Sequence, residues 1–231
     1  MIKFLKESLF HTTKTANSED RLRKILGASQ FPDESFYKFG EKYFDGGAGS
    51  LSYGTYEYDG RYTNSVIRII DQFDLKETSR ILELGCAKGY ILYEFYKLGF
   101  SDLLGVDVSE YAILNAPEEL QGKLRVGSVV NLSSILEFPQ PYDFIFSKEM
   151  LPHLTSEEIS TFFECLLKVA SHETTMYFEI QTARNSVGLE SILRYDPTHK
   201  SLMTPDEWVQ FINEKMSGVK ANILVFLKEL F

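Results

Sequence analysis

"ILELGCAKGY", residues 81–90, decides the fold: it predicts a short buried strand that runs into a turn of small residues. The residues that follow, up to Gly99, have the spacing of an amphipathic helix. A strand, a tight turn and a helix in this order usually hold a nucleotide-like ligand at the turn. The stretch therefore predicts a ligand site at the carboxyl end of a strand.

Strands and helices alternate from about residue 64 to the end of the chain. Predicted strands cover 79–84, 102–108, 123–128, 142–147, 174–182 and 219–227. Predicted helices cover 64–75, 88–99, 109–116, 156–170 and 204–216. Strands separated by helices form parallel βαβ units. The pattern therefore predicts an α/β fold, a doubly wound Rossmann-like sheet with helices on both faces.

Three regions divide the chain. Residues 1–48 are predicted to form a mostly helical extension, with one helix over "NSEDRLRKILG" at 17–27. The glycine-rich "DGGAGS" at 45–50 is a flexible break. Residues 49–63 are predicted to be an aromatic lid or linker, and 64–231 the main domain.

Composition limits the partners. The chain of 231 residues carries a net charge of −9, which disfavours nucleic acid as a partner. Two distant cysteines, Cys86 and Cys165, form no metal-binding spacing and no disulfide framework. The first residues lack the long apolar run of a signal peptide, and no segment approaches about 20 apolar residues. We therefore expect a soluble, cytoplasmic protein with no metal, no nucleic acid and no membrane partner; the sequence does not indicate its oligomeric state.

The turn departs from a dinucleotide fingerprint. That fingerprint needs small residues at three positions, which here are Gly85, Ala87 and Tyr90. Ala87 is tolerable where the backbone approaches a pyrophosphate, but Tyr90 is too bulky for close packing of helix on strand. A P-loop is excluded because no Gly-Lys-Ser/Thr follows. The turn leaves room for a ligand without forming a phosphate cradle.

Two acidic residues flank the turn at informative positions. Glu83 lies two residues before Gly85, where a carboxylate suits a cationic ligand better than a pyrophosphate. Asp107 ends the second strand of the alternating region, 22 residues beyond Gly85. An acidic residue at that place accepts hydrogen bonds from ribose hydroxyls. Together with Gly85 and Gly89, these residues predict a nucleoside-like cofactor that carries positive charge.

With these residues the sequence resembles the class I S-adenosylmethionine (SAM)-dependent methyltransferases. "ILELGCAKGY" resembles the first, glycine-rich motif of that family, and "GVDVSE" resembles the second. "RVGSVVNL" occupies the place of the third motif, and "YDFIFSKEMLPHL" resembles the fourth. The resemblance covers roughly residues 64–231 and is specific as a set of motifs. Only one clear strand follows the final helix, so the sequence predicts a sheet that is shortened at that edge.

The resemblance implies SAM as the cofactor, with S-adenosylhomocysteine (SAH) as product, and a set of binding residues. Asp107 would bind the ribose, Ser128 and Val129 would lie along the adenine, and Ser147 and Lys148 would face the methionine part and the acceptor. The predicted cofactor-binding residues of the main domain are Glu83, Gly85, Cys86, Ala87, Gly89, Asp107, Val108, Ser128, Val129, Ser147 and Lys148. Ala87 and Ser128 depart from the family pattern and predict a reshaped cofactor site.

Three residues are candidates for catalysis. Methyl transfer requires the protein to position the acceptor and to remove a proton from it. His153 follows the fourth strand of the alternating region, beside the expected methyl group, and imidazole titrates near neutral pH. Glu149 is the second candidate, with a structural or cofactor contact as its alternative role. His199 lies in a segment that often covers the acceptor in this family.

The stretch "YGTYEYDGRY", residues 53–62, combines four tyrosines with an aspartate and an arginine. It either packs aromatic rings over the sheet or covers the cofactor. As a lid, it would use Arg61 to pair with the methionyl carboxylate and Tyr53 and Tyr58 to stack on the sulfonium or on a sugar. The stretch resembles segments ahead of the glycine motif in bacterial methyltransferases of surface-polysaccharide pathways. That resemblance implies a small polar acceptor.

The predicted function is O-methylation of a small polar metabolite by SAM. The acceptor would be a sugar, a nucleotide sugar or a phosphorylated precursor in the synthesis of a capsule or another surface glycan. Three alternatives stay open: an N-methyltransferase of a small amine, an NAD-dependent oxidoreductase, and a non-catalytic methyltransferase-like binding subunit.

Overall fold

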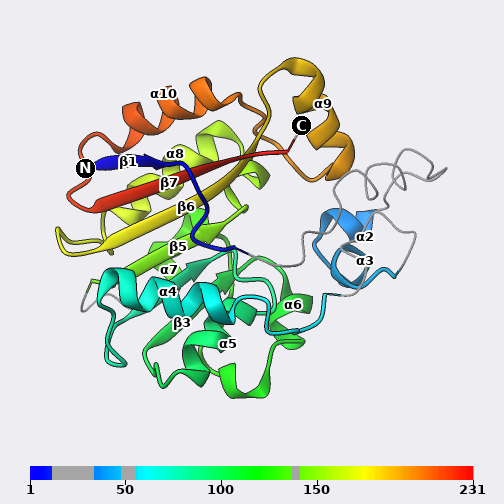
Figure 1. The fold of residues 1–231 in the computed structure, drawn as a ribbon. Coiled ribbons are helices and arrows are strands. Elements are labelled where there is room, and N and C mark those ends of the chain that lie inside the picture. Colours follow the sequence, from blue (N-terminus) through cyan, green and yellow to red (C-terminus); the bar gives the residue numbers. More distant parts are fainter. Residues whose placement is uncertain (12–33, 48–55, 137–140, 231) are drawn as a thin grey trace.

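The computed structural model describes residues 1–11, 34–47, 56–136 and 141–230. Its strands form one seven-stranded sheet in the order β1-β7-β6-β5-β2-β3-β4, and every neighbouring pair is parallel (Figure 1). The strands are β1 (Ile2–Leu5), β2 (Ile81–Leu84), β3 (Leu103–Asp107), β4 (Leu124–Val126), β5 (Phe144–Lys148), β6 (Thr175–Thr182) and β7 (Asn222–Glu229). The predicted doubly wound α/β sheet is confirmed, and the strand order reverses between β2 and β5.

The N-terminal strand β1 corrects two expectations. The sequence predicts a mostly helical region over 1–48, yet Ile2–Leu5 is a strand that pairs with β7, Ile2 opposite Ile223. The terminal ammonium adds a hydrogen bond to the carbonyl oxygen of Ala221, at 2.9 Å. The sheet is therefore not shortened at this edge, because the start of the chain supplies the outer strand. The helix predicted over 17–27 lies outside the described residues.

Helices cover both faces of the sheet (Figure 1). One face packs against α4 (Thr63–Phe73) and α5 (Tyr90–Lys97), and the other against α7 (Leu132–Ile135), α8 (Ser156–Leu166) and α10 (Pro205–Met216). The remaining helical elements are α2 (Glu34–Tyr37), α3 (Glu41–Phe44), α6 (Glu110–Leu114), α9 (Ser186–Tyr195), and the short 3-10 helices η1 (Glu118–Leu120), η2 (Val129–Asn131) and η3 (Leu151–His153). The helical elements that follow β2, β3, β4 and β5 begin within a few residues of the carboxyl ends of these strands.

Three helices begin at a capping side chain. The Ser109 hydroxyl accepts a hydrogen bond from the Ala112 N–H, at 2.9 Å, and begins α6. Thr155 and Thr204 form capping boxes with Glu158 and Glu207 at the starts of α8 and α10. Such a cap stabilises a helix by about 1 kcal/mol. These caps fix where the chain leaves the sheet edge that carries the site.

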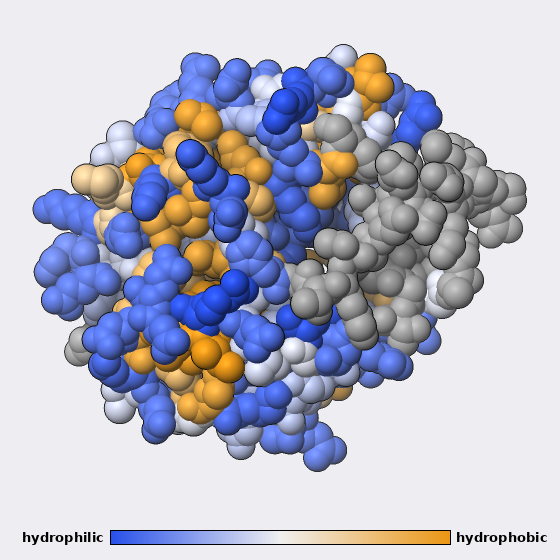
Figure 2. Space-filling model, in the orientation of Figure 1, coloured by the Kyte–Doolittle hydropathy of each residue, from blue (hydrophilic) through white to orange (hydrophobic). Residues whose placement is uncertain are grey.

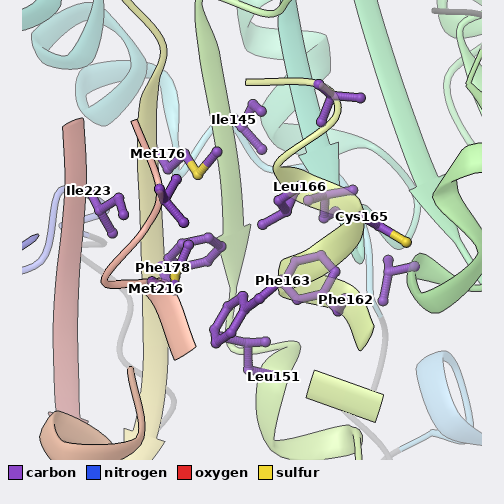
Figure 3. Close-up of a cluster of buried hydrophobic side chains, with 14 of the residues drawn as sticks. Ile145, Leu151, Phe162, Phe163, Cys165, Leu166, Met176, Phe178, Met216 and Ile223 are labelled. Atoms are coloured by element: carbon purple, nitrogen blue, oxygen red, sulfur yellow. The ribbon is translucent and has the colours of Figure 1, made fainter. Parts of the chain in front are cut away.

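The core under α8 and α10 is built from large side chains. Phe162 and Phe163 of α8 pack on Phe178 of β6, with ring centroids 6.3 and 5.9 Å apart (Figure 3). Ile145 of β5 and Met176 of β6 are fully buried beside them (Figure 3). Such close packing leaves little freedom for strand movement. It holds β5, whose carboxyl end reaches the candidate site, in a fixed position.

The surface is mostly polar. Figure 2 shows hydrophilic residues over most of one face, with hydrophobic residues exposed among them. Dispersed apolar exposure of this kind is ordinary for a folded protein. Within the described segments, no helix is both long enough and apolar enough to cross a membrane.

Candidate active site

A cavity of about 290 Å³ opens at the carboxyl ends of β2, β3 and β5. This volume is near the lower end of the range of small-molecule sites, roughly 300–1,000 Å³. Residues from the predicted cofactor set that line it are Glu83, Gly85, Cys86, Ala87, Asp107, Val108, Ser128, Val129 and Lys148. The structure thus brings together residues that are up to 65 positions apart, at the strand-order reversal where such sheets bind ligands.

The turn after β2 has left-handed backbone at three residues, Gly85 (φ 76°), Ala87 (φ 49°) and Gly89 (φ 72°). A side chain on Gly85 is excluded, because its Cβ would lie 2.5 Å from the Cγ of Met150. Ala87 holds a conformation that favours glycine, at a cost of roughly 1–2 kcal/mol. Gly89 does not line the cavity: a Cβ there would meet Leu120 at 2.9 Å, so it serves helix packing.

Asp107 ties the turn to the end of β3. Its Oδ2 accepts a hydrogen bond from the Ala87 N–H at 2.7 Å, and its Oδ1 accepts one from the Ser109 N–H at 2.8 Å. Burial raises the pKa of Asp107, and these two backbone donors oppose that rise. Each oxygen keeps a lone pair that can accept from a ligand hydroxyl. The residue therefore shapes the turn and keeps acceptor capacity for a ligand.

Glu83 is a buried carboxyl group on the cavity wall. Burial and the nearby Asp107 raise the pKa of Glu83 well above its ordinary value. Its Oε2 has no hydrogen-bond partner among the described residues. A buried polar atom without a partner is costly unless a ligand satisfies it. A cationic group in the cavity would supply that partner, which fits the methionyl ammonium of SAM.

An aromatic cover closes the cavity opposite the sheet. It comprises Phe39, Tyr43, Phe44 and Tyr56, which lie on or beside α2 and α3. The cover is anchored by Asp45, whose Oδ2 lies 2.6 Å from the Lys88 Nζ and accepts from the Tyr111 hydroxyl at 2.8 Å. The sequence analysis assigns no site role to these residues. The aromatic density of "FYKFGEKYF" (36–44) is the feature that could have indicated them.

Residues 53–62 are predicted to form a lid over the cofactor, but the residues of this stretch that line the cavity are not the predicted ones. Tyr53 lies outside the described residues. Tyr58 is not on the cavity and donates to Glu94 Oε1 at 2.7 Å, and Arg61 forms a two-bond pair with Asp59 at 2.8 and 2.9 Å. The structure thus brings neither of them to the cavity. Tyr56 and Tyr62, the other two tyrosines of the same stretch, line it instead.

Lys148 and Glu149 belong to a buried ionic cluster at the end of β5. Glu149 Oε1 lies 2.5 Å from Lys148 Nζ and 2.6 Å from Lys228 Nζ, and Lys148 Nζ also lies 3.2 Å from Glu179 Oε1. Burial alone would raise the pKa of Glu149, but the two lysines outweigh it and hold the pKa well below its ordinary value. A carboxylate with so low a pKa is a weak base. Ser147, also in the predicted set, is buried and does not line the cavity.

His153 ends η3 and lines the cavity, and His199 packs directly behind it. The centroids of the two imidazole rings are 4.6 Å apart, and Phe39 meets His153 edge-on at 5.6 Å. His199 is buried and is not a lining residue. The Thr198 hydroxyl lies 2.8 Å from His153 Nδ1. The two histidines predicted as catalytic candidates therefore pack against each other, but only His153 lines the cavity.

The same histidines form the one group in the described part of the chain whose side chains could together hold a metal ion. His153, Asp196 and His199 each offer an atom, and these atoms lie within 4.8 Å of one another. The Thr198 hydroxyl already bridges His153 and Asp196. Hydrogen bonds through Thr198 therefore link two of the three members, His153 and Asp196.

Comparison with known proteins gives the class. The model of the family "Methyltransferase domain" matches residues 75–215, which is more than half of the chain. The chain belongs to this family. The match includes the turn after β2, Asp107 and His153, and it decides against the alternative of an NAD-dependent oxidoreductase. The cofactor is SAM, and the cavity residues described above fit it.

Two solved structures have a similar fold. A SAM-dependent methyltransferase from Archaeoglobus fulgidus is 22% identical, with a TM-score of 0.53 and coverage of 79% of this chain and 74% of that one. The plantazolicin methyltransferase BpumL, solved with SAH, is 25% identical, with a TM-score of 0.55 and coverage of 87% and 77%. A curated relative, EEF1A lysine methyltransferase 2 of Danio rerio, is 30% identical over 97 residues. That match spans 42% of this chain and 40% of the relative's length.

Proposed function

We propose that this chain transfers the methyl group of SAM to a hydroxyl of a small polar metabolite. The observation that carries the proposal is that His153, whose imidazole nitrogen can accept a proton, lines the same cavity as Asp107 and Glu83. Donor site and candidate base therefore share one enclosed space. A hydroxyl acceptor needs such a base, whereas an amine needs only to arrive neutral.

The donor end of the cavity is formed by β2, β3 and the segment after β4. SAM, when bound, supplies a methyl group already activated on a sulfonium. Asp107 would accept hydrogen bonds from the ribose hydroxyls, and Ser128 and Val129 would lie along the adenine. Glu83 would pair with the methionyl ammonium, for which its partnerless Oε2 is the supporting observation. These assignments leave the part of the cavity near His153 for the acceptor.

The acceptor end combines aromatic and charged side chains. Phe39 and Tyr43 of the aromatic cover offer faces on which a sugar or a base can stack, and Lys200 and Glu158 line the opposite rim. Lys200 is half exposed and lies 3.3 Å from Glu158, so its ammonium is available to an anionic group. This mixture supports a sugar, a nucleotide sugar or a phosphorylated precursor. Residues 53–62 resemble segments of bacterial methyltransferases that act in surface-polysaccharide pathways, and this resemblance supports a role in the synthesis of a bacterial surface glycan.

N-methylation of a small amine is the second candidate. It is favoured by the name of the Danio rerio relative, a lysine methyltransferase. An amine acceptor would make the proton-accepting role of His153 unnecessary once the amine is neutral. The two candidates therefore differ in whether His153 is needed.

Incubation with SAM and a panel of acceptors tests the proposal. The panel contains sugars, sugar phosphates, nucleotide sugars, small amines and a lysine peptide, and mass spectrometry detects one added methylene. We expect a product only from a hydroxyl-bearing polar acceptor, with the methyl on oxygen. A product methylated on nitrogen would overturn O-methylation in favour of the second candidate. SAM binding without transfer to any member would contradict the proposed acceptor class.

A further inference from the structure

A line of hydrogen bonds runs from His153 to a buried carboxylate. The Thr198 hydroxyl oxygen lies 2.8 Å from His153 Nδ1 and 2.6 Å from Asp196 Oδ1. Asp196 and Thr198 are both buried, at 2% and 6% exposure. The Asp196 oxygens also accept from the Thr198 N–H at 3.0 Å and from the Tyr43 hydroxyl at 2.8 Å. Every bond to Asp196 in this line comes from a donor, as an ionised carboxylate requires.

The donors and acceptors fix where the protons are. An ionised carboxylate can only accept, so the single hydroxyl proton of Thr198 points at Asp196. The hydroxyl oxygen must then accept from His153, whose Nδ1 therefore carries the proton. A neutral imidazole has one N–H, which leaves Nε2 as a bare acceptor. Three donors favour the ionised form of Asp196: the Thr198 hydroxyl, the Thr198 N–H and the Tyr43 hydroxyl. Burial raises the pKa of Asp196, but the charge of His153 and His199, when these are protonated, and the hydrogen bonds from Thr198 hold the pKa below its ordinary value.

We propose that Thr198 and Asp196 are positioning residues that hold His153 as the Nδ1–H tautomer, with Nε2 free to take a proton from the acceptor. The inference rests on the proposed function at one point, which is the transfer of a proton from the acceptor to His153. Once His153 is protonated, Asp196 stabilises the imidazolium through the Thr198 hydroxyl, as the buried aspartate does in serine hydrolases. Phe39 and His199 hold the ring from its edge and its side.

The hydrogen bonds of Asp196 also connect the aromatic cover of the cavity to His153. Tyr43 belongs to α3, and its hydroxyl bond to Asp196 spans 153 positions of sequence. The backbone carbonyl oxygen of Phe39, between α2 and α3, accepts from the Ser109 hydroxyl at 2.5 Å. Docking of this cover therefore completes the hydrogen-bond shell of Asp196.

Nitrogen-15 NMR of histidine rings tests the tautomer directly. The chain has four histidines, so ring signals can be assigned with single His→Gln variants. At a pH where the rings are neutral, we expect His153 to carry its proton on Nδ1 and to show an unprotonated Nε2. Thr198→Val removes the hydroxyl at nearly constant shape and should abolish this preference, whereas Thr198→Ser should keep it. A wild-type His153 protonated on Nε2, or an unchanged tautomer in Thr198→Val, would overturn the proposal.

Activity gives a second, separate readout. Thr198→Val is expected to lower turnover about tenfold or more, with Thr198→Ser close to wild type. Asp196→Asn should keep the tautomer, because the Thr198 N–H still fixes the amide oxygen, but should also lower turnover through loss of charge. SAM affinity should stay within about twofold in all three variants, since none of them contacts the donor end. If the wild-type protein does not bind SAM, the proposed function is contradicted. The NMR experiment still tests the tautomer of His153 in that case.

A metal ion is the competing occupant of this cluster. Addition of Zn²⁺ or of EDTA should leave the His153 and His199 ring signals unchanged. A stoichiometric change in both rings with Zn²⁺ would overturn the proposal, because a metal bound to the cluster would displace the hydrogen bond from Nδ1.

Discussion

His153→Ala is expected to lower the rate of methyl transfer by about 10²- to 10⁴-fold while the affinity for SAM stays nearly unchanged. The imidazole lines the acceptor end of the cavity, so its loss removes the proton acceptor without touching Asp107, Glu83 or Ser128. Turnover is measured at saturating SAM with the acceptor identified from the panel. Calorimetry gives the SAM affinity of the same preparation.

His172→Ala is the matched control for this variant. His172 is exposed (82% of its side chain) and lies far from the cavity lining, so turnover should equal that of the wild type. Unchanged turnover in His153→Ala would show that this residue is not the base. A loss of SAM affinity as large as the loss of turnover would also contradict the assignment, because it would place His153 at the donor.

Glu149→Gln is expected to cost about 3–5 kcal/mol of the free energy of unfolding. The substitution removes the negative charge between Lys148 and Lys228 in a largely buried cluster, where Gln181 also donates to Glu149 Oε2 at 2.5 Å. After the substitution two lysines share one carboxylate, Glu179, which lies 3.2 Å from Lys148 and 4.0 Å from Lys228. Chemical denaturation measures this difference. A structural role of this size would account for Glu149 without a catalytic one.

The contribution of Glu149 to the free energy of unfolding also depends on pH. The pKa of Glu149 is held well below its ordinary value in the folded protein, so its contribution is fully present above the unfolded pKa of about 4.3. The contribution is lost as the pH falls through the lower folded pKa. The stability difference between wild type and Glu149→Gln should therefore be large at pH 7 and shrink below about pH 4.

Glu190→Gln serves as the control for a surface ion pair. Glu190 and Arg194 are paired on α9 with more than half of each side chain exposed, so the expected loss is below about 1 kcal/mol. A Glu149→Gln variant with wild-type stability and greatly reduced turnover would contradict the structural role and return Glu149 to the candidate bases.

Local patterns predicted the centre of the sheet well. Strands β2 and β5 are buried along most of their length, and their sequences, ILEL and FIFSK, are therefore largely apolar. The caps at Ser109, Thr155 and Thr204 marked the helix starts because each is a short-range interaction. Asp107 could be placed for the same reason: it directly ends a strand.

Other features depend on contacts between distant segments. Strand β1 is four residues long and only partly buried, so it leaves no apolar run, and its partner β7 lies more than 200 residues away. The hydrogen bond between Tyr43 and Asp196 likewise joins residues 153 positions apart, so no local sequence pattern predicts it. Thr198 and His153 are 45 positions apart, and their contact depends on how the loop after α9 folds onto η3. One ionic partner of Glu149, Lys148, is its neighbour in sequence, but the other, Lys228, lies 79 positions away on β7, so the sequence position of Glu149 alone suggested a base.

Calorimetric titration with SAM tests the central claim, that the cavity at the ends of β2, β3 and β5 is the donor site. We predict binding of one SAM per chain by the wild type, and affinity about 10- to 100-fold weaker for Asp107→Ala for each ribose hydrogen bond that is lost. Asp107→Asn, which keeps the shape of the side chain, and unfolding curves of both variants control for folding. No SAM binding by the wild type, or equal affinity in a folded Asp107→Ala variant, would contradict the account.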